Sequence, residues 1–410
     1  MPVEPRSVLL VTPRWTRDGG VSTHAIASAI ALAHDGVAVH VLAARVEAEQ
    51  SAGAITVHHS PRLFDAAASP ETRLAGTLDV APDVVHSHQF EDPALLAVMR
   101  KHAPVLISVH GYTACSSGVH YFRPGQECTR AHGPGCIPNL ALRGCAHTRN
   151  PSSLPAAYRH ASSGLAAIRS ADLTISYSSA VDRHLATNGI EPRMVIPLFA
   201  TMEPQVGSGH EGRRRVVFAG RVIDAKGVGV LIRAIREIDA EVVICGDGWR
   251  TEAMRRLARR LGLAKRVHFR GWLSPDELAT ELAEASIVAL PSLWPEPFGL
   301  VGIEALAAGR PVIASLTGGV GDWLEDGVNG LAVKPGDVRA LARALGDLLD
   351  DPARQAELGA AGQAMVAARF SPERHVEQLL EAYRGARRAW QERPEGRGGV
   401  SPARVAQPTG

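Results

Sequence analysis

Residues 290–305 read LPSLWPEPFGLVGIEA, and this stretch decides how the second half of the chain is interpreted. The apolar run that ends at Leu290 is typical of a buried strand, and the prolines that follow it indicate a turn. The segment after Gly299 is typical of a helix. The stretch therefore predicts a strand, a turn and a helix, which is the repeating unit of α/β proteins.

Two carboxylates, eight positions apart, flank the start of this helix. Glu296 lies in the turn and Glu304 about one turn inside the helix, so they would face different parts of an extended ligand. Gly299 allows a close backbone approach, and the N–H groups of Leu300 and Val301 with the helix dipole favour an anion. The pattern predicts a phosphate between two hydroxyl-binding carboxylates. The competing interpretation makes Glu304 an ordinary helix carboxylate.

Two cations precede this unit in the sequence. Arg221 follows a predicted strand directly, and Lys226 opens the next helix five positions later. A planar guanidinium and a compact ammonium are well suited to a diphosphate whose negative charge grows as a bond breaks. The alternative is a pair of solvated surface cations.

Length and composition favour a soluble protein of two domains. The chain has 410 residues, a length that exceeds what one hydrophobic core usually supports. Its 45% hydrophobic and 21% charged residues are ordinary values for a globular protein. Its net charge is +2 with no long basic block, so nucleic acid is not an expected partner. The apolar run at 8–11 is too short for a signal peptide, and no run of eighteen apolar residues follows. These features predict a cytoplasmic protein.

Short β-branched runs alternate with helical patterns along the whole chain, as in parallel sheets covered by helices. A polar segment rich in Gly and Pro, residues 197–215, is the candidate linker between two doubly wound domains. Ligands of such sheets bind at the carboxyl ends of the strands. The strands are expected at 7–11, 37–42, 84–86, 105–110, 173–176 and 194–196, then at 216–219, 242–245, 267–269, 287–290, 312–314 and 331–333.

The segment 296–304 resembles the Glu-(seven residues)-Glu signature of the family-4 retaining glycosyltransferases of GT-B fold. Arg221 and Lys226 are similar to the other half of that signature, and further matches occur at 19–20, 246–248 and 325–330. The resemblance implies an α/β protein with two Rossmann-like doubly wound domains that face a central cleft.

The resemblance also implies a domain organisation. Residues 1–199 would form the acceptor-side domain, with a Cys-rich insertion at about 112–150, and residues 200–370 the nucleotide-sugar-binding domain. A C-terminal helix at 371–392 would pack back towards the first domain. The tail 393–410 has a composition that favours disorder.

Site residues follow from the matched positions. Glu296 would bind hydroxyls of the donor sugar, Glu304 the ribose hydroxyls, and Arg221 with Lys226 the diphosphate. Backbone amides of the loop entering the helix would complete the donor site. The resemblance thus assigns Glu296, Arg221, Lys226 and His110 to catalysis, and Gly20, Gly299, Leu300, Val301 and Glu304 to donor binding.

Gly20 and His110, the two candidate residues in the first half of the chain, also have simpler explanations. Gly20 belongs to a Gly-Gly pair that the family uses to close on the donor phosphate or acceptor, but a tight turn needs glycine anyway. His110 ends a strand where the family often has a histidine near the donor sugar, although local backbone groups would also satisfy it. No catalytic role is assigned to His86 or His88.

Four cysteines, Cys115, Cys128, Cys136 and Cys145, cluster in the insertion. Paired Cys-x2–4-Cys spacings typical of zinc sites are absent, and disulfides conflict with a cytoplasmic location. A metal site, disulfide pairs and free thiols therefore all stay open.

Two segments depart from the family pattern. Residues 198–200 replace the usual Asn-Gly-acid at the hinge, and residues 318–322 replace a more usual Gly-Gly-x-Pro-Glu. The second change leaves open which contacts the Pro-Glu pair would have made.

The predicted function is transfer of a sugar, with retention, from a nucleoside-diphosphate sugar to a hydroxyl of a small natural product or a cell-surface glycan or lipid. A lipid-linked acceptor would place the protein peripherally at the inner membrane face. No cofactor is expected, and no metal, because no Asp-x-Asp pair ends a strand. The alternatives are a sugar-nucleotide epimerase and a non-catalytic sugar-nucleotide-binding homologue on the same fold.

Overall fold

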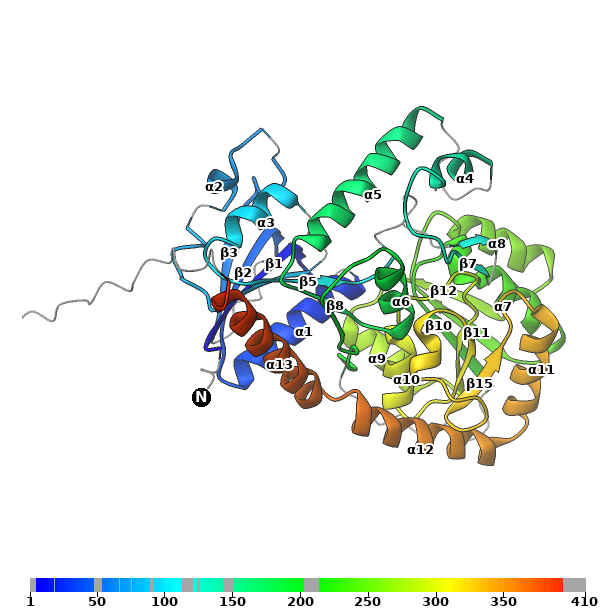
Figure 1. The fold of residues 1–410 in the computed structure, drawn as a ribbon. Coiled ribbons are helices and arrows are strands. Elements are labelled where there is room, and N and C mark those ends of the chain that lie inside the picture. The colour runs from blue at the N-terminus through cyan, green and yellow to red at the C-terminus, as the bar shows by residue number, and fades with distance from the viewer. Residues whose placement is uncertain are drawn as a thin grey trace, which may run out of the picture.

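The computed structural model describes residues 5–17, 19–47, 54–65, 67–74, 76–88, 92–112, 121–123, 126–142, 151–202 and 214–393. These residues form two parallel sheets in two lobes, each sheet packed with helices (Figure 1). Among the helices described, none combines the length and the hydropathy of a bilayer-spanning segment.

The first sheet has the strand order β3-β2-β1-β4-β5-β8-β9, with all neighbours parallel. Its strands are buried on both faces: Val8 and Leu10 of β1 pack in one core, and Leu9 and Val11 in another. The order reverses between β1 and β4. The strands are β1 (Ser7–Trp15), β2 (Ala38–Val46), β3 (Ile55–His59), β4 (Val84–His88), β5 (Val105–Val109), β8 (Leu173–Ser176) and β9 (Arg193–Val195).

Helices lie between most of these strands in the sequence, as in other α/β proteins. They are α1 (Gly20–His34), α2 (Pro70–Arg73), α3 (Pro93–Met99), α4 (Cys136–Leu142), the single-turn η1 (Pro151–Ser153), α5 (Leu154–Arg169) and α6 (Ser179–Thr187). A short antiparallel pair, β6 (Tyr121–Arg123) and β7 (Gln126–Glu127), lies in the expected insertion.

The second sheet has the order β12-β11-β10-β13-β14-β15, again parallel throughout. Its alternating residues are also buried on both faces, since Val216 and Phe218 of β10 lie in one core and Val217 and Ala219 in the other. The order reverses between β10 and β13. The strands are β10 (Arg215–Ala219), β11 (Glu241–Cys245), β12 (Val267–Gly271), β13 (Ile287–Leu290), β14 (Val312–Ser315) and β15 (Gly330–Val333).

The helices of this half include a capping box at α9, where Ser274 and Glu277 cap each other's backbone. They are η2 (Asp224–Lys226), α7 (Val228–Ala234), η3 (Ile235–Glu237), α8 (Thr251–Arg260), α9 (Pro275–Ala283), α10 (Leu300–Ala307), η4 (Gly319–Asp322), α11 (Val338–Leu349), α12 (Pro352–Arg369) and α13 (Pro372–Gln391).

The last helix returns to the first lobe. Figure 1 shows α12 along the second lobe and α13 beside α1. Tyr383 of α13 contacts His86 through its hydroxyl, 2.8 Å from Nδ1, and the Trp390 indole donates to the Arg100 carbonyl at 3.1 Å. The C-terminal segment therefore ties the two lobes together.

The predicted α/β architecture with two Rossmann-like sheets is confirmed, and each expected strand is present. The sequence patterns missed β3, which is an edge strand with only Ile55 buried and two histidines at its end. Edge strands lack the continuous apolar run by which buried parallel strands are recognised. Of the expected tail, only Arg393 lies within the described residues.

Candidate active site

Three of the predicted site residues follow the two strands between which the second sheet reverses its order. Arg221 and Lys226 follow β10, and Glu296 follows β13, the neighbouring strand on the other side of the reversal. Loops from such adjacent strands separate in opposite directions and leave a crevice at the carboxyl edge of the sheet. The topology thus explains why these distant segments converge.

Lys226 and Glu296 form an ion pair. The Lys226 Nζ lies 2.7 Å and 2.8 Å from the two carboxylate oxygens of Glu296, whose side chain is 3% exposed. The Ser292 hydroxyl donates to the same carboxylate. Sequence analysis placed the two residues on different parts of the ligand, and the structure brings them into direct contact. The ammonium has three N–H donors, so it can hold Glu296 and still reach a phosphate oxygen.

An aromatic ring lies beside the ammonium, and a second cation, Arg221, follows the same strand, β10. The Trp294 ring centroid lies 5.6 Å from the Lys226 Nζ, and its indole nitrogen is buried without a hydrogen-bond partner among the described residues. Arg221 is exposed, and within the described part of the chain it forms no ion pair. A buried donor without an acceptor and an unneutralised guanidinium both favour an anionic ligand here.

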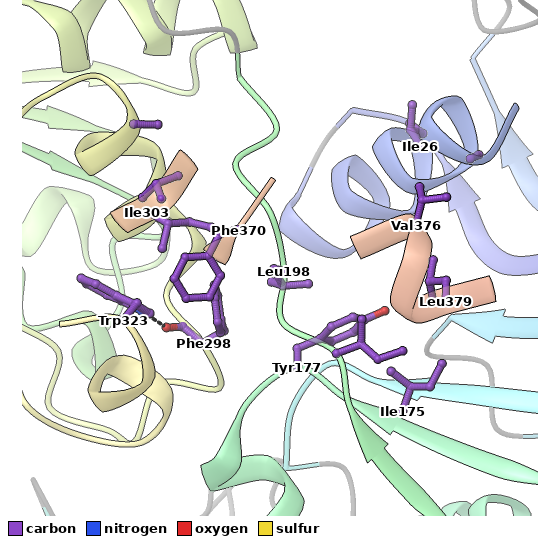
Figure 2. Packing of buried hydrophobic residues seen from close by; sticks show 14 of the residues in the cluster. Ile26, Ile175, Tyr177, Leu198, Phe298, Ile303, Trp323, Phe370, Val376 and Leu379 are labelled. Atoms are coloured by element: carbon purple, nitrogen blue, oxygen red, sulfur yellow. Dashed lines mark hydrogen bonds between the residues drawn. The ribbon is translucent and has the colours of Figure 1, made fainter. Parts of the chain in front are cut away.

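The N-terminus of α10 has no side-chain cap. Its N-cap, Gly299, has a φ of 86° and supplies no side-chain cap, so the first-turn amides of Leu300 and Val301 lack an intrahelical acceptor. Trp323 holds the preceding loop, because its indole donates to the Phe298 carbonyl at 2.7 Å (Figure 2). Donor amides and the helix dipole are thus fixed in place for an anion.

Glu304 lies one turn into α10 and is buried. Thr201 donates its hydroxyl to Glu304 Oε1 at 2.8 Å. Burial raises the pKa of Glu304 to about 7, and hydrogen bonds from Thr201 oppose that rise. Glu304 is only 7% exposed, and this burial favours the donor-binding role over that of an ordinary helix carboxylate.

His110 follows β5 and lies at the centre of a group of buried histidines. Its Nε2 is 3.2 Å from His88 Nδ1, and its ring packs against Tyr177 with 4.5 Å between centroids. Burial lowers the pKa of His110, so its imidazole is neutral at pH 7. A neutral imidazole has one donor and one acceptor nitrogen, so while Nε2 pairs with His88 the Nδ1 of His110 can exchange a hydrogen bond with a sugar hydroxyl.

The Gly-Gly turn opens α1. Gly19 is the N-cap with a φ of 134°, and Gly20 is the first helical residue; a Cβ on either would meet nothing within 4 Å. The backbone conformation requires glycine at position 19, while the open space at position 20 leaves its surface accessible. The family resemblance predicts Gly20 as the donor-binding residue, and the structure shows that Gly19 is the one under conformational constraint.

Sequence reasoning missed the contribution of residues 318–322. The Gly319 amide donates to the Glu296 carbonyl at 2.7 Å, and Gly318 lies so close that a Cβ would be 2.2 Å from that oxygen. Asp322 accepts from the Ser179 amide at 2.7 Å and from its hydroxyl, across the two lobes. The departure from the family pattern was the available signal, because it singled out this segment without revealing its contacts.

No cluster of three or more His, Cys, Asp or Glu side chains within the described ranges is arranged to hold a metal ion. Cys136 is a free thiol, whereas Cys115 and Cys145 lie outside the described residues. A metal site, disulfide pairs and free thiols therefore all stay open for the group of four cysteines.

The fold and the site together define the GT-B class. Sucrose-phosphate synthase from Thermosynechococcus elongatus superposes with a TM-score of 0.69 at 22% identity, covering 93% of this chain and 98% of that one. Two family profiles then account for most of the sequence. Residues 18–203 match the one described as Glycosyltransferase Family 4, and residues 203–365 match Glycosyl transferases group 1. The chain belongs to glycosyltransferase family 4.

Relatives of known name share a part of the sequence. The chain is 36% identical over 228 residues to the D-inositol 3-phosphate glycosyltransferase of Rhodococcus opacus (strain B4), covering 53% of this chain and 46% of the relative. It is 37% identical over 175 residues to the GDP-mannose-dependent alpha-(1-6)-phosphatidylinositol monomannoside mannosyltransferase of Mycolicibacterium smegmatis, covering 40% and 45%. The matches thus span less than half the length of these curated relatives.

Proposed function

We propose that the protein transfers a glycosyl group from a nucleoside-diphosphate sugar to an acceptor hydroxyl with retention of configuration. The observation that carries this proposal is the convergence of Lys226, Glu296 and the uncapped N-terminus of α10 at one switch point. A cation, a buried carboxylate and free amides match the phosphate and the hydroxyls of such a donor.

Each of the site residues has a separate role in the proposed reaction. Arg221, Lys226 and the α10 amides neutralise the diphosphate as the bond from its oxygen to the anomeric carbon breaks. Glu296 accepts hydrogen bonds from the sugar, and His110 holds a further hydroxyl. The acceptor oxygen bonds to the anomeric carbon on the face that the diphosphate leaves, and its proton passes to the departing phosphate oxygen. The transition state resembles the oxocarbenium ion of glycosidases.

The proposed acceptor is a cyclitol hydroxyl, free, phosphorylated or lipid-linked. This proposal rests on the names of the two relatives, one acting on an inositol phosphate and one on a phosphatidylinositol mannoside. We further propose a cytoplasmic location, peripheral at the inner membrane face for a lipid-linked acceptor. The free thiols of Cys136 and Cys245 are compatible with a reducing compartment.

A nucleotide panel tests the donor site. UDP, GDP, ADP and dTDP are added to the purified protein, with and without EDTA, and the melting temperature is followed. We expect one of them to raise it, since a ligand at a hundred times its Kd adds about 2.7 kcal/mol to the free energy of unfolding. EDTA should have no effect. An Arg221→Ala/Lys226→Ala variant should lose the response.

Product analysis with the matching nucleotide sugar then tests the reaction. Release of the nucleoside diphosphate only when a cyclitol acceptor is present supports transfer. Interconversion of the nucleotide sugar without an acceptor would establish an epimerase instead. A folded wild type that responds to none of the four nucleotides would refute the donor site.

Donor affinity is expected to depend on pH through Glu304. Its pKa of about 7 means that the carboxylate, the better acceptor for ribose hydroxyls, is lost as the pH falls below 7. The Kd of the donor nucleotide should therefore rise about tenfold from pH 8 to pH 6. Titration calorimetry at both pH values checks this. Glu304→Gln cannot ionise and serves as the control: the same pH dependence in that variant would assign the effect to the phosphates.

A further inference from the structure

The segment that joins the two sheets runs between their cores. After β9, Leu198 is buried in the same hydrophobic cluster as Ile303 of α10 and Val376 of α13, and Phe199 is buried against the rings of His24 and His375. Figure 2 shows Leu198 between the residues of the second lobe and those of the first. The packing of these two side chains fixes the course of the backbone, and the residues that follow are held next to α10.

Thr201 lies in this joining segment and binds Glu304 twice. Its hydroxyl donates to Oε1 at 2.8 Å, and its backbone also forms a hydrogen bond with the carboxylate. The two residues are 103 positions apart, so the contact exists only in the folded protein. The neighbours of Glu304 in α10, Ile303 and Ala305, are fully buried, and Glu304 itself is only 7% exposed.

We propose that Thr201 is the positioning residue of Glu304. Its hydroxyl holds Oε1 and directs the remaining lone pairs of the carboxylate towards the ribose of the donor, an assignment that rests on the proposed function above. The joining segment thereby sets the orientation of a donor-binding group in the second domain.

The hydroxyl also favours the charged form of Glu304. Burial alone raises the pKa of this carboxyl, and the hydrogen bonds from Thr201 are the opposing influences, with no charged side chain of the described residues contributing. A hydroxyl donates more strongly to a carboxylate than to a carboxylic acid. Removing it should therefore leave Glu304 both less fixed and less ionised at neutral pH.

The test compares three variants. Thr201→Val removes the hydroxyl at similar volume, Thr201→Ser keeps it, and Thr187→Val removes the hydroxyl of an exposed threonine of α6 as a matched control. The ionisation of Glu304 is followed in the ligand-free protein through its carboxyl ¹³C signal, which Glu304→Gln identifies. Binding of UDP and GDP is measured by calorimetry at several pH values, and kcat and KM are measured with the matching nucleotide sugar.

Thr201→Val is expected to raise the titration midpoint of Glu304 by about one pH unit. The donor KM and the nucleotide Kd should then rise about fivefold at pH 7, because about one tenth of the carboxyl groups stay ionised instead of about half. The kcat should change less than twofold, since Glu304 contacts the ribose and not the reacting atoms. Thr201→Ser should restore the wild-type midpoint and affinity.

An unchanged midpoint in Thr201→Val, or a shifted midpoint with unchanged donor affinity, would overturn the proposal. A midpoint shift of the same size in Thr187→Val would overturn it as well. If the wild type binds no nucleotide, the donor site itself fails, and Thr201 has no ribose group to position. The ligand-free titration separates that outcome from a failure of the contact between Thr201 and Glu304.

Discussion

Lys226→Met is expected to lower kcat/KM for the donor by about a hundredfold or more, because the ammonium faces the charge that grows on the departing diphosphate. The variant should also lose about 3 kcal/mol of the free energy of unfolding. Lys226 is bonded to both oxygens of Glu296, a carboxylate 3% exposed, and removing the cation leaves that charge buried and unpaired. Steady-state kinetics and urea denaturation measure the two effects.

A second substitution separates the two causes. In Lys226→Met/Glu296→Gln the unpaired charge is gone, so most of the stability should return while activity stays low. Lys265→Met is the matched control. Lys265 is exposed and precedes β12, so it lies at the amino ends of the strands, whereas the site lies at their carboxyl ends. Activity within a few-fold of wild type in Lys226→Met would exclude the lysine from leaving-group stabilisation.

Gly318→Ala is expected to destabilise the protein by about 3 kcal/mol or more and to abolish donor binding. Gly318 has a φ of 62° and a ψ of −132°, which side chains other than glycine avoid. Its new Cβ would lie 2.2 Å from the Glu296 carbonyl oxygen and 2.6 Å from its nitrogen. Backbone atoms cannot turn aside as a flexible side chain can, so the loop bearing Glu296 must move.

The control for this substitution is Gly262→Ala. Gly262 also has a positive φ, 73°, but a Cβ there would meet nothing within 4 Å. Gly262→Ala should lower the free energy of unfolding by about 1 kcal/mol, the cost of the conformational strain alone, and leave donor binding unchanged. Urea denaturation and calorimetry with the donor nucleotide compare the two variants. Equal stabilities would mean that the loop of Glu296 adapts without cost.

Much of the fold was predictable because buried parallel strands have a local signature. A strand covered on both faces is a short continuous apolar run, as at residues 287–290 and 312–314, and the glycines and prolines after it mark the loops. The edge strand β3 lacks that run and was missed. The strand order was not predicted, because no local pattern states which strands are neighbours; the resemblance to a family implied only that both domains are doubly wound.

The candidate site was predictable as a set of residues and not as a set of contacts. Arg221, Lys226, Glu296 and Glu304 stand out because their spacing around strand ends and a helix start suits a phosphate ligand. The contact between Asp322 and Ser179 could not be predicted from the sequence. Its hydrogen bonds link the two lobes, but an acid in a glycine-rich loop has no distinctive sequence pattern.

The sequence by itself determined the class of fold, the family and the residues proposed to bind the donor, since these depend on periodicity and on spacings within short segments. The tertiary structure decided which of those residues touch. Lys226 and Glu296 are 70 positions apart, Thr201 and Glu304 are 103 apart, and Ser179 and Asp322 are 143 apart. Such contacts form only when the order of the strands and the packing of the two lobes bring the segments together, and local sequence patterns encode neither.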